Sequence, residues 1–240
     1  MINGFITSIV KKRNPHFSLD NHLTISDLYS FFIRQSLAVI RGQLCWLYGR
    51  KPQLMLRAQG VTFEYLPRIK WGKFLKLGKQ VHLSGLGTQG LVLGDNVSIG
   101  DYSKVVVSTT LNNIGKGITI GNNVGMGEYA YLGGAGGLTI GENCIIGQYF
   151  SCHPENHVYD DPKTLTRLQG VSRKGIRIGA NCWIGSKVTI LDGAEIGHGC
   201  VIAAGAVVNG TFPDFSVIGG VPARILKNRN QQATLITNQN

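Results

Sequence analysis

The sequence predicts an all-β solenoid, a three-sided coil of short strands, with an α-helical extension at its amino-terminal end. Three observations lead to this fold class. An aliphatic residue recurs every six positions from residue 91 onward, glycine reaches 33 of the 240 residues, and an amphipathic segment occupies residues 24–50. Helices repeat near 3.6 residues and strands near 2, so a period of six indicates one short strand joined to one corner.

The six-residue period is most regular between residues 178 and 208. Aliphatic residues stand there in unbroken register, namely Ile178, Ile184, Ile190, Ile196, Ile202 and Val208. The same spacing, with a glycine following each aliphatic residue, appears earlier at Leu93, Ile99, Ile114, Ile120, Met126, Ile140 and Ile146. Three such units close a triangular coil, and their aliphatic side chains stack inside it.

The corners and the remaining interior of this coil also have a sequence pattern. Asparagine tolerates positive φ, and Asn96, Asn123, Asn143 and Asn181 each fall three places after the aliphatic residue of their unit. Small residues two places before the aliphatic position should fill the interior: Cys144, Cys182, Val188, Ala194 and Cys200. Cys182 and Cys200 should therefore stack in adjacent coils as buried free thiols.

Charge divides the chain into two parts. The net charge is +11, and residues 1–79 carry 13 basic and 3 acidic residues, a balance of +10. We therefore expect a basic helical extension over 1–79, a coil over 80–227 with an extruded loop at 151–173, and a polar tail over 228–240. The five cysteines form no CxxC pair and no secretory signal precedes them, which favours a reduced, cytoplasmic protein.

The six-residue register breaks at three places, and these breaks indicate segments with a role other than building the coil. The step is nine residues from Val105 to Ile114, eight from Leu132 to Ile140, and 32 from Ile146 to Ile178. The longest break carries two histidines, His153 and His157, among carboxylates. An excursion of this length is usually functional, and histidine is the side chain suited to proton transfer near neutral pH. The sequence therefore predicts an active site at this break.

These motifs resemble those of the hexapeptide-repeat acetyltransferases, in their sugar and polysaccharide O-acetyltransferase branch, over residues 80–227. The resemblance implies a left-handed parallel β-helix, acetyl-CoA as the acyl donor, a homotrimer, a saccharide acceptor and no metal. The element Asn156-His157-Val158-Tyr159 followed by Asp161-Pro162 favours His157 as the catalytic base, whereas His153-Pro154 is similar to the pair in serine acetyltransferases. Asp160 or Asp161 would orient the imidazole.

The resemblance also implies binding residues. Trp183 would line the acceptor pocket or cover a subunit seam, and Glu155, Asn156 and Tyr159 accompany the histidines. The expected acetyl-CoA residues are Gly185, Ser186, Ala203, Ala204, Gly205, Pro222, Arg224 and Lys227. Relatives often carry Thr-Lys where this chain has Asn209-Gly210, so one cationic contact is missing and Arg224 and Lys227 would compensate for it.

The amino-terminal segment predicts a helix that starts at a Thr or Ser cap with Asp27 in its first turn. Its broad apolar arc must be covered. Capping of the open coil end is the first interpretation, apposition to an anionic inner membrane surface the second, and nucleic-acid binding the last, since no binding motif accompanies the charge. Arg34 and Arg41 interrupt the apolar stretch, which argues against a membrane-spanning helix.

The expected activity is transfer of acetyl from acetyl-CoA to a sugar hydroxyl of a bacterial surface polysaccharide or its lipid-linked precursor. Acetylation of an antibiotic or another small molecule, including a serine-type acceptor, is an alternative within the same chemistry. A zinc hydratase on the same coil would need three converging histidines, and the sequence offers no third near His153 and His157. A non-catalytic scaffold would leave the histidine-bearing loop unexplained.

Overall fold

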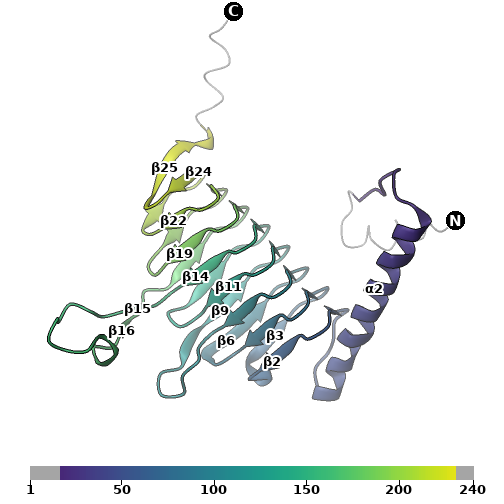
Figure 1. Cartoon of the computed structure of the whole chain (residues 1–240), viewed down its shortest axis with the longest axis horizontal. Helices are drawn as coiled ribbons and strands as arrows, with labels where there is room; N and C mark the ends of the chain where they lie inside the picture. Colours follow the sequence, from purple (N-terminus) through teal and green to yellow (C-terminus); the bar gives the residue numbers. More distant parts are fainter. Residues whose placement is uncertain (1–16, 231–240) are drawn as a thin grey trace, which may run out of the picture.

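The computed structural model describes residues 17–230, which form a three-sided β-helix with one long helix beside its amino-terminal end (Figure 1). Three parallel sheets make its sides, and every successive coil adds one strand to each sheet. The predicted fold class, a left-handed parallel β-helix with a helical extension, is confirmed.

The strands of the three sheets alternate along the chain. Sheet 1 contains β1 (Leu56–Arg57), β4 (Lys76–Leu77), β7 (Ser98–Ile99), β10 (Gly125–Met126), β13 (Ile145–Ile146), β18 (Trp183–Ile184), β21 (Val201–Ile202), β24 (Ser216–Gly220) and the antiparallel β25 (Ala223–Asn228). Sheet 2 contains β2 (Thr62–Glu64), β5 (His82–Ser84), β8 (Lys104–Val106), β11 (Tyr131–Gly133), β14 (Ser151–His153), β19 (Thr189–Leu191) and β22 (Val207–Val208). Sheet 3 contains β3 (Ile69–Trp71), β6 (Gly87–Leu93), β9 (Gly115–Ile120), β12 (Leu138–Ile140), β17 (Ile176–Ile178), β20 (Glu195–Ile196) and β23 (Thr211–Phe212).

The interior is filled as the six-residue period predicts. All six aliphatic residues of the run from Ile178 to Val208 are buried, each no more than 2 % exposed. The small residues predicted as interior fillers are buried with them, and the five cysteines are free. Register partners Trp183 and Val201 place Cys182 and Cys200 in neighbouring coils. The Cys144 and Cys182 thiols lie 3.3 Å from backbone carbonyl oxygens of the next coil, which fits an inert packing role.

Two of the three corners are regular. At the corner from sheet 3 to sheet 1, the predicted asparagines adopt left-handed φ values of 56 to 60°. Side-chain amides continue this corner as a ladder, because Asn96 donates to Asn123 and Asn123 donates to Asn143, both at 3.0 Å. At the corner from sheet 1 to sheet 2, Tyr102, Tyr129 and Tyr149 take the left-handed positions, and their rings stack at 5.2 and 5.1 Å. The tyrosine ladder was not predicted.

The third corner, from sheet 2 to sheet 3, absorbs the variation in coil length. Four residues join sheet 1 to sheet 2 in every coil, whereas the segments from sheet 2 to sheet 3 range from two residues to the 22 between β14 and β17. The extruded loop leaves the coil here and contains a hairpin of β15 (Asn156–His157) and β16 (Val171–Ser172), followed in Figure 1 from the edge of the coil. All three register breaks therefore lie along one edge of the molecule.

The coil begins earlier than the predicted boundary at residue 80. Strands β1 to β4 already pair with the strands of later coils, so residues 56–79 belong to the β-helix and not to the helical extension. Buried residues recur here every six positions, at Ile69, Leu75 and Val81. Basic residues on the outer faces of the same strands make this spacing hard to recognise in the sequence. Short 3₁₀ helices, η2 (Leu66–Arg68) and η3 (Thr166–Leu168), lie in corner and loop segments.

Helix α2 (Ile25–Gln43) starts as predicted, and the 3₁₀ helix η1 (Leu44–Tyr48) follows it. The Asp27 backbone N–H donates to the Thr24 hydroxyl, and the Asp27 carboxylate accepts from the Thr24 backbone N–H, which completes a capping box. The helix lies against β1, and Gly42 approaches Met55 so closely that a Cβ there would meet the Met55 carbonyl. Most of the expected polar tail, residues 231–240, lies outside the described residues.

Candidate active site

His153 ends strand β14, at the edge where the three insertions emerge. Its ring stacks on that of Tyr131 in the preceding coil, with centroids 5.6 Å apart and an interplanar angle of 22°. The pocket beside it has a volume of about 180 Å³ and is lined by residues 106–110, 133–135 and 152–155 together with Arg173. Burial lowers the pKa of His153 below its ordinary value of 6.5, so the imidazole is neutral at pH 7 and can accept a proton.

His157 lies in a different setting. It belongs to the β15–β16 hairpin, where it pairs with Val171, and its side chain is exposed. Asn156, Tyr159 and Asp160 are exposed on the same loop. The Asp161 carboxylate accepts from the Thr164 hydroxyl at 2.6 Å and from the Lys163 N–H at 2.9 Å, and these bonds lower its pKa. Within residues 17–230, neither Asp160 nor Asp161 is hydrogen-bonded to an imidazole.

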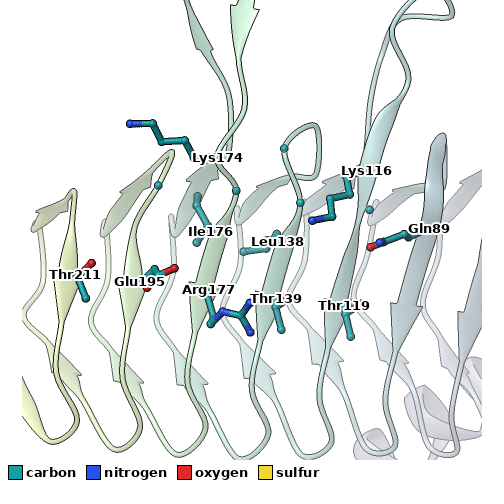
Figure 2. Close-up of a pocket in the computed structure, with 15 residues that line it drawn as sticks. Gln89, Lys116, Thr119, Leu138, Thr139, Lys174, Ile176, Arg177, Glu195 and Thr211 are labelled. Atoms are coloured by element: carbon teal, nitrogen blue, oxygen red, sulfur yellow. The ribbon is translucent and has the colours of Figure 1, made fainter.

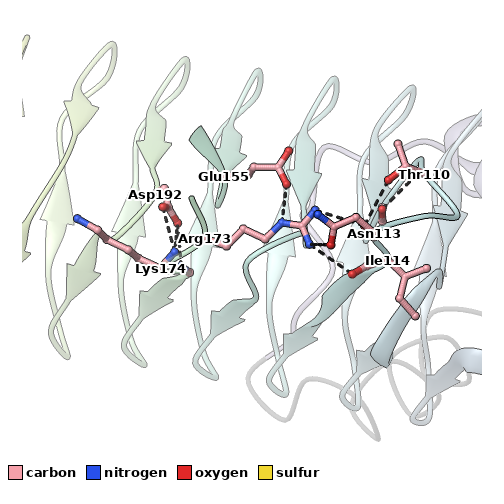
Figure 3. Close-up of polar contacts among 9 residues, drawn as sticks. Thr110, Asn113, Ile114, Glu155, Arg173, Lys174 and Asp192 are labelled. Carbon is pink, nitrogen blue, oxygen red and sulfur yellow. Dashed lines mark hydrogen bonds and ion pairs between the residues drawn. The ribbon is translucent and has the colours of Figure 1, made fainter. Parts of the chain in front are cut away.

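Arg173 anchors the extruded loop, a role that the sequence did not suggest (Figure 3). Its Nε donates to the Glu155 carboxylate at 2.6 Å, and its Nη1 donates to the Asn113 side-chain oxygen at 2.8 Å. Beside it, the Asp192 carboxylate accepts the backbone N–H groups of Lys174 and Gly175. Glu155, expected to contact the acceptor, thus has its carboxylate engaged with a guanidinium. These bonds hold two of the insertions together around the His153 pocket.

A second hollow continues the His153 pocket along the outer face of sheet 2. Its volume is about 320 Å³, and it shares Val106, Ser108, Thr109 and Tyr131 with the His153 pocket. Glu64 and His82 lie at its far end, with the His82 Nε2 3.7 Å from the Glu64 carboxylate. We call the two hollows together the sheet 2 groove. It crosses the strands from β2 to β14, successive strands lying about 4.8 Å apart.

The expected cofactor residues gather at another corner. Gly185 and Ser186 follow β18, and 203–205 follow β21, so both segments lie between sheets 1 and 2, where the Gly205 N–H donates to the Ser186 carbonyl at 2.9 Å. Arg224 and Lys227 lie in β25 on sheet 1, and Pro222 is in the turn before it. Trp183 points outward from the same sheet and is 59 % exposed, as predicted. The structure therefore brings these residues together along one corner and its adjoining sheet.

The two sets of residues do not meet within one chain. His153 pairs with Leu191 of the next coil, which lies five residues after Ser186 along the chain. An extended strand covers about 16 Å over five residues, so the full width of sheet 2 separates the imidazole from the expected cofactor corner. If both sets of residues act in the same reaction, His153 of one copy would work with the expected cofactor residues of another copy.

A third hollow lies on sheet 3, and the sequence gave no indication of it. Figure 2 shows this sheet 3 groove, which has a volume of about 510 Å³. Its lining includes Gln89, Lys116, Thr119, Thr139, Lys174, Arg177, Glu195 and Thr211, with backbone of five glycines. These residues are scattered over six strands of the sequence, and only the stacking of successive coils brings them side by side.

Two alternatives concern metals and membranes. Within residues 17–230 of one chain, no group of three His, Cys, Asp or Glu side chains could hold a metal ion. In the same part of the chain, no helix has the length and apolarity needed to span a bilayer.

This chain is similar in sequence to several known proteins. The bacterial transferase hexapeptide (six repeats) family model matches residues 175–210. The chain is 31 % identical over 156 residues to "Probable acetyltransferase Rv3034c" of Mycobacterium tuberculosis, covering 65 % of this chain and 50 % of that protein. It is 29 % identical over 174 residues to "Putative lipopolysaccharide biosynthesis O-acetyl transferase WbbJ" of Escherichia coli K12, covering 70 % and 75 %. The present chain thus spans half the length of the first of these relatives.

Among solved structures, the N-acyltransferase AntD of Bacillus cereus, in complex with dTDP-4-amino-4,6-dideoxyglucose and coenzyme A, superposes with a TM-score of 0.53. The match is 19 % identical and covers 77 % of this chain and 85 % of AntD, so the two share the fold. The six-residue coil, the repeat model and the acetyltransferase relatives agree. The chain is thus similar to hexapeptide-repeat acetyltransferases in its repeat, its fold and its sequence relatives.

Proposed function

We propose that this protein is an acetyl-CoA-dependent O-acetyltransferase whose acceptor is a hydroxyl of a bacterial surface polysaccharide or its lipid-linked precursor. The observation that carries the proposal is the His153 imidazole, which stacks on Tyr131 and lines a pocket at the edge where the coil's insertions emerge, and whose pKa is lowered by partial burial. The name of the E. coli relative supports an O-acetyl transferase that serves polysaccharide assembly.

The chemistry requires one base and no metal. His153 takes the proton of the acceptor hydroxyl as its oxygen attacks the thioester carbonyl carbon. Backbone N–H groups near the coil corners stabilise the tetrahedral oxyanion. The carbon–sulfur bond then breaks, and the coenzyme A thiolate takes the proton back from the imidazolium. We assign this role to His153 and not to His157. Both side chains are exposed, but the His153 ring lines the pocket and stacks on Tyr131, whereas His157 lines none of the hollows described above.

The sheet 2 groove is the proposed acceptor site. It leads from His153 past Tyr131 and Lys104 to His82 and Glu64, and it offers an aromatic ring together with hydrogen-bonding side chains. Such a lining suits a saccharide, because sugars present both hydroxyls and an apolar face. The groove crosses five successive strands of sheet 2, so its length favours an oligosaccharide or polymer over a single sugar.

A homotrimer would unite the site. His153 and the expected acetyl-CoA residues lie at different corners of the triangular coil, and a threefold ring places one corner of each copy against a different corner of its neighbour. Outward apolar side chains on sheet 1, Ile145 at 67 % and Trp183 at 59 % exposure, provide surface for such a contact. The acetyl group would then pass from coenzyme A on one copy to an acceptor beside His153 of the next.

The test is a thiol-release assay with acetyl-CoA across a panel of nucleotide sugars, oligosaccharides and polysaccharide fragments. We expect acceptor-dependent release of coenzyme A, largest for acceptors of more than one sugar residue. Equal release with and without every saccharide, or transfer to amines alone, would contradict the proposal.

We further propose that the cytoplasmic enzyme meets its lipid-linked acceptor at the anionic membrane surface through α2 and η1. These segments expose Ile25 at 85 %, Trp46 at 65 %, Leu47 at 61 % and Tyr48 at 62 %. The excess of basic residues in this part of the chain favours anionic lipid, and apolar side chains enter the headgroup region.

Vesicle sedimentation tests this location. The protein should bind vesicles containing anionic phosphatidylglycerol more than neutral phosphatidylcholine vesicles, and 0.5 M salt should weaken the binding through charge screening. Replacing Trp46 and Leu47 with alanine should weaken it about tenfold, whereas Tyr159→Ala, at an equally exposed aromatic on the loop, should not. Equal behaviour of these variants would count against the helix as the contact.

A further inference from the structure

The sheet 3 groove differs in charge from the His153 pocket. Three cationic side chains, Lys116, Lys174 and Arg177, line it against the single carboxylate of Glu195. Within residues 17–230, none of these three cations forms a salt bridge. Arg177 is the register partner of Glu195, yet in Figure 2 its guanidinium lies toward Thr139. The groove therefore presents unpaired positive charge.

Two of the cations are braced by glycines. Gly137 and Gly193 have left-handed φ values of 100 and 81°, and a Cβ at either would lie 3.0 Å from the Cδ of Lys116 or Lys174 respectively. The lysine stems thus lie against backbone that only glycine leaves open, and their freedom is reduced before any ligand arrives. Such bracing favours a bound anion over a merely solvated surface.

The groove adjoins the proposed active site. Its wall includes Gly136, Gly137 and Lys174, while Gly134, Ala135 and Arg173 line the His153 pocket. The two hollows therefore lie on either side of the same ridge, made of residues 133–137 and 173–175. A substrate could hold its charged group in one hollow and its reacting group in the other.

We propose that the sheet 3 groove is a binding site for a diphosphate group of a substrate. This inference rests on the proposed function, in which both the nucleotide- or lipid-linked saccharide and coenzyme A carry a diphosphate. A volume of about 510 Å³ suits a ligand of that size, and its hydroxyl and amide lining suits a hydrophilic one. Lys116 and Arg177 donate charge-assisted hydrogen bonds to the phosphate oxygens, and Lys174, whose amine points away from them in Figure 2, adds positive charge at the rim.

The experiment measures binding of inorganic pyrophosphate by titration calorimetry at about 0.15 M salt, without turnover. We expect Lys116→Gln and Arg177→Gln each to weaken binding about tenfold, and the double variant about a hundredfold. Lys79→Gln removes the same charge from a distant corner of the coil and should change binding less than twofold. Circular dichroism checks that the variants, altered only at outward-facing positions, remain folded.

Two further titrations distinguish the sources of the diphosphate. Weaker binding of UDP-glucose by the double variant assigns the groove to the acceptor, and weaker binding of coenzyme A assigns it to the cofactor. Pyrophosphate affinity within twofold of the unaltered protein in the double variant, or an equal loss in Lys79→Gln, would overturn the proposal. Failure of the transfer reaction itself appears separately, as absent thiol release in the unaltered protein.

Discussion

Replacing His153 with alanine should lower kcat by about 10²- to 10⁴-fold, the usual contribution of a general base. The substitution removes the proton acceptor from the pocket but leaves the coil interior intact, since the His153 side chain points outward from β14. Coenzyme A affinity and the melting temperature should therefore change little. A thiol-release assay should show the loss of turnover, and a binding titration should show unchanged affinity for coenzyme A.

The matched control is His157→Ala, which alters the other imidazole of the same loop. We expect it to retain activity within a few-fold, because His157 lies on the hairpin and does not line the pocket beside His153. If His157→Ala abolishes turnover and His153→Ala does not, the base is His157, as its sequence element suggests. The structure of the trimer would then have to bring that hairpin to the reacting atoms.

The pH profile gives an independent check on the base. Burial lowers the pKa of His153, so its neutral form persists below the ordinary value of 6.5. The rate should stay level from pH 8 to pH 7 and fall only as acid protonates the imidazole at a pH below 6.5. A fall in rate that begins above pH 6.5 would contradict His153 as the base.

Arg173→Ala should reduce kcat by about 10- to 100-fold. A displacement of catalytic groups by up to about 1 Å has an effect of this size. The guanidinium joins Glu155 to Asn113, and without it the walls of the His153 pocket separate. Loss of these charge-assisted bonds should also lower the free energy of unfolding by about 1–3 kcal/mol. Initial rates and urea unfolding measure the two effects.

Conservative variants separate positioning by Arg173 from general destabilisation. Arg173→Lys keeps the ion pair with Glu155 but cannot donate to both partners in the same plane, so it should restore only part of kcat. In a double-mutant cycle, Arg173→Ala and Glu155→Gln should be less than additive in kcat, because they break the same contact. Full additivity, or a change confined to stability, would contradict the positioning role.

Much of the coil could be predicted because its residues repeat locally. A buried isoleucine every six positions and an asparagine at a left-handed corner describe one strand and one turn at a time, as at Ile184 and Asn181. The start of the coil was misplaced because Lys70, Lys73 and Lys76 face outward from its first strands and dominate the composition there. These surface lysines made the six-residue spacing of the buried residues difficult to recognise.

The candidate site was only partly readable. The long register break identified the segment that bears His153 and His157, but the ring stacking that distinguishes His153 depends on Tyr131 in another coil. Arg173 gave no signal, since its partners Glu155 and Asn113 lie 18 and 60 residues away. The sheet 3 groove was hidden for the same reason.

The sequence by itself determined the repeat, the buried face of each strand and the corner residues, because each depends on neighbours a few positions apart. The tertiary structure alone decided that all the insertions share one edge, that His153 has a pocket, and that three cationic side chains line one groove on sheet 3. Those features arise from the number of residues in every intervening coil. That number sets which side chains lie above one another after each full turn.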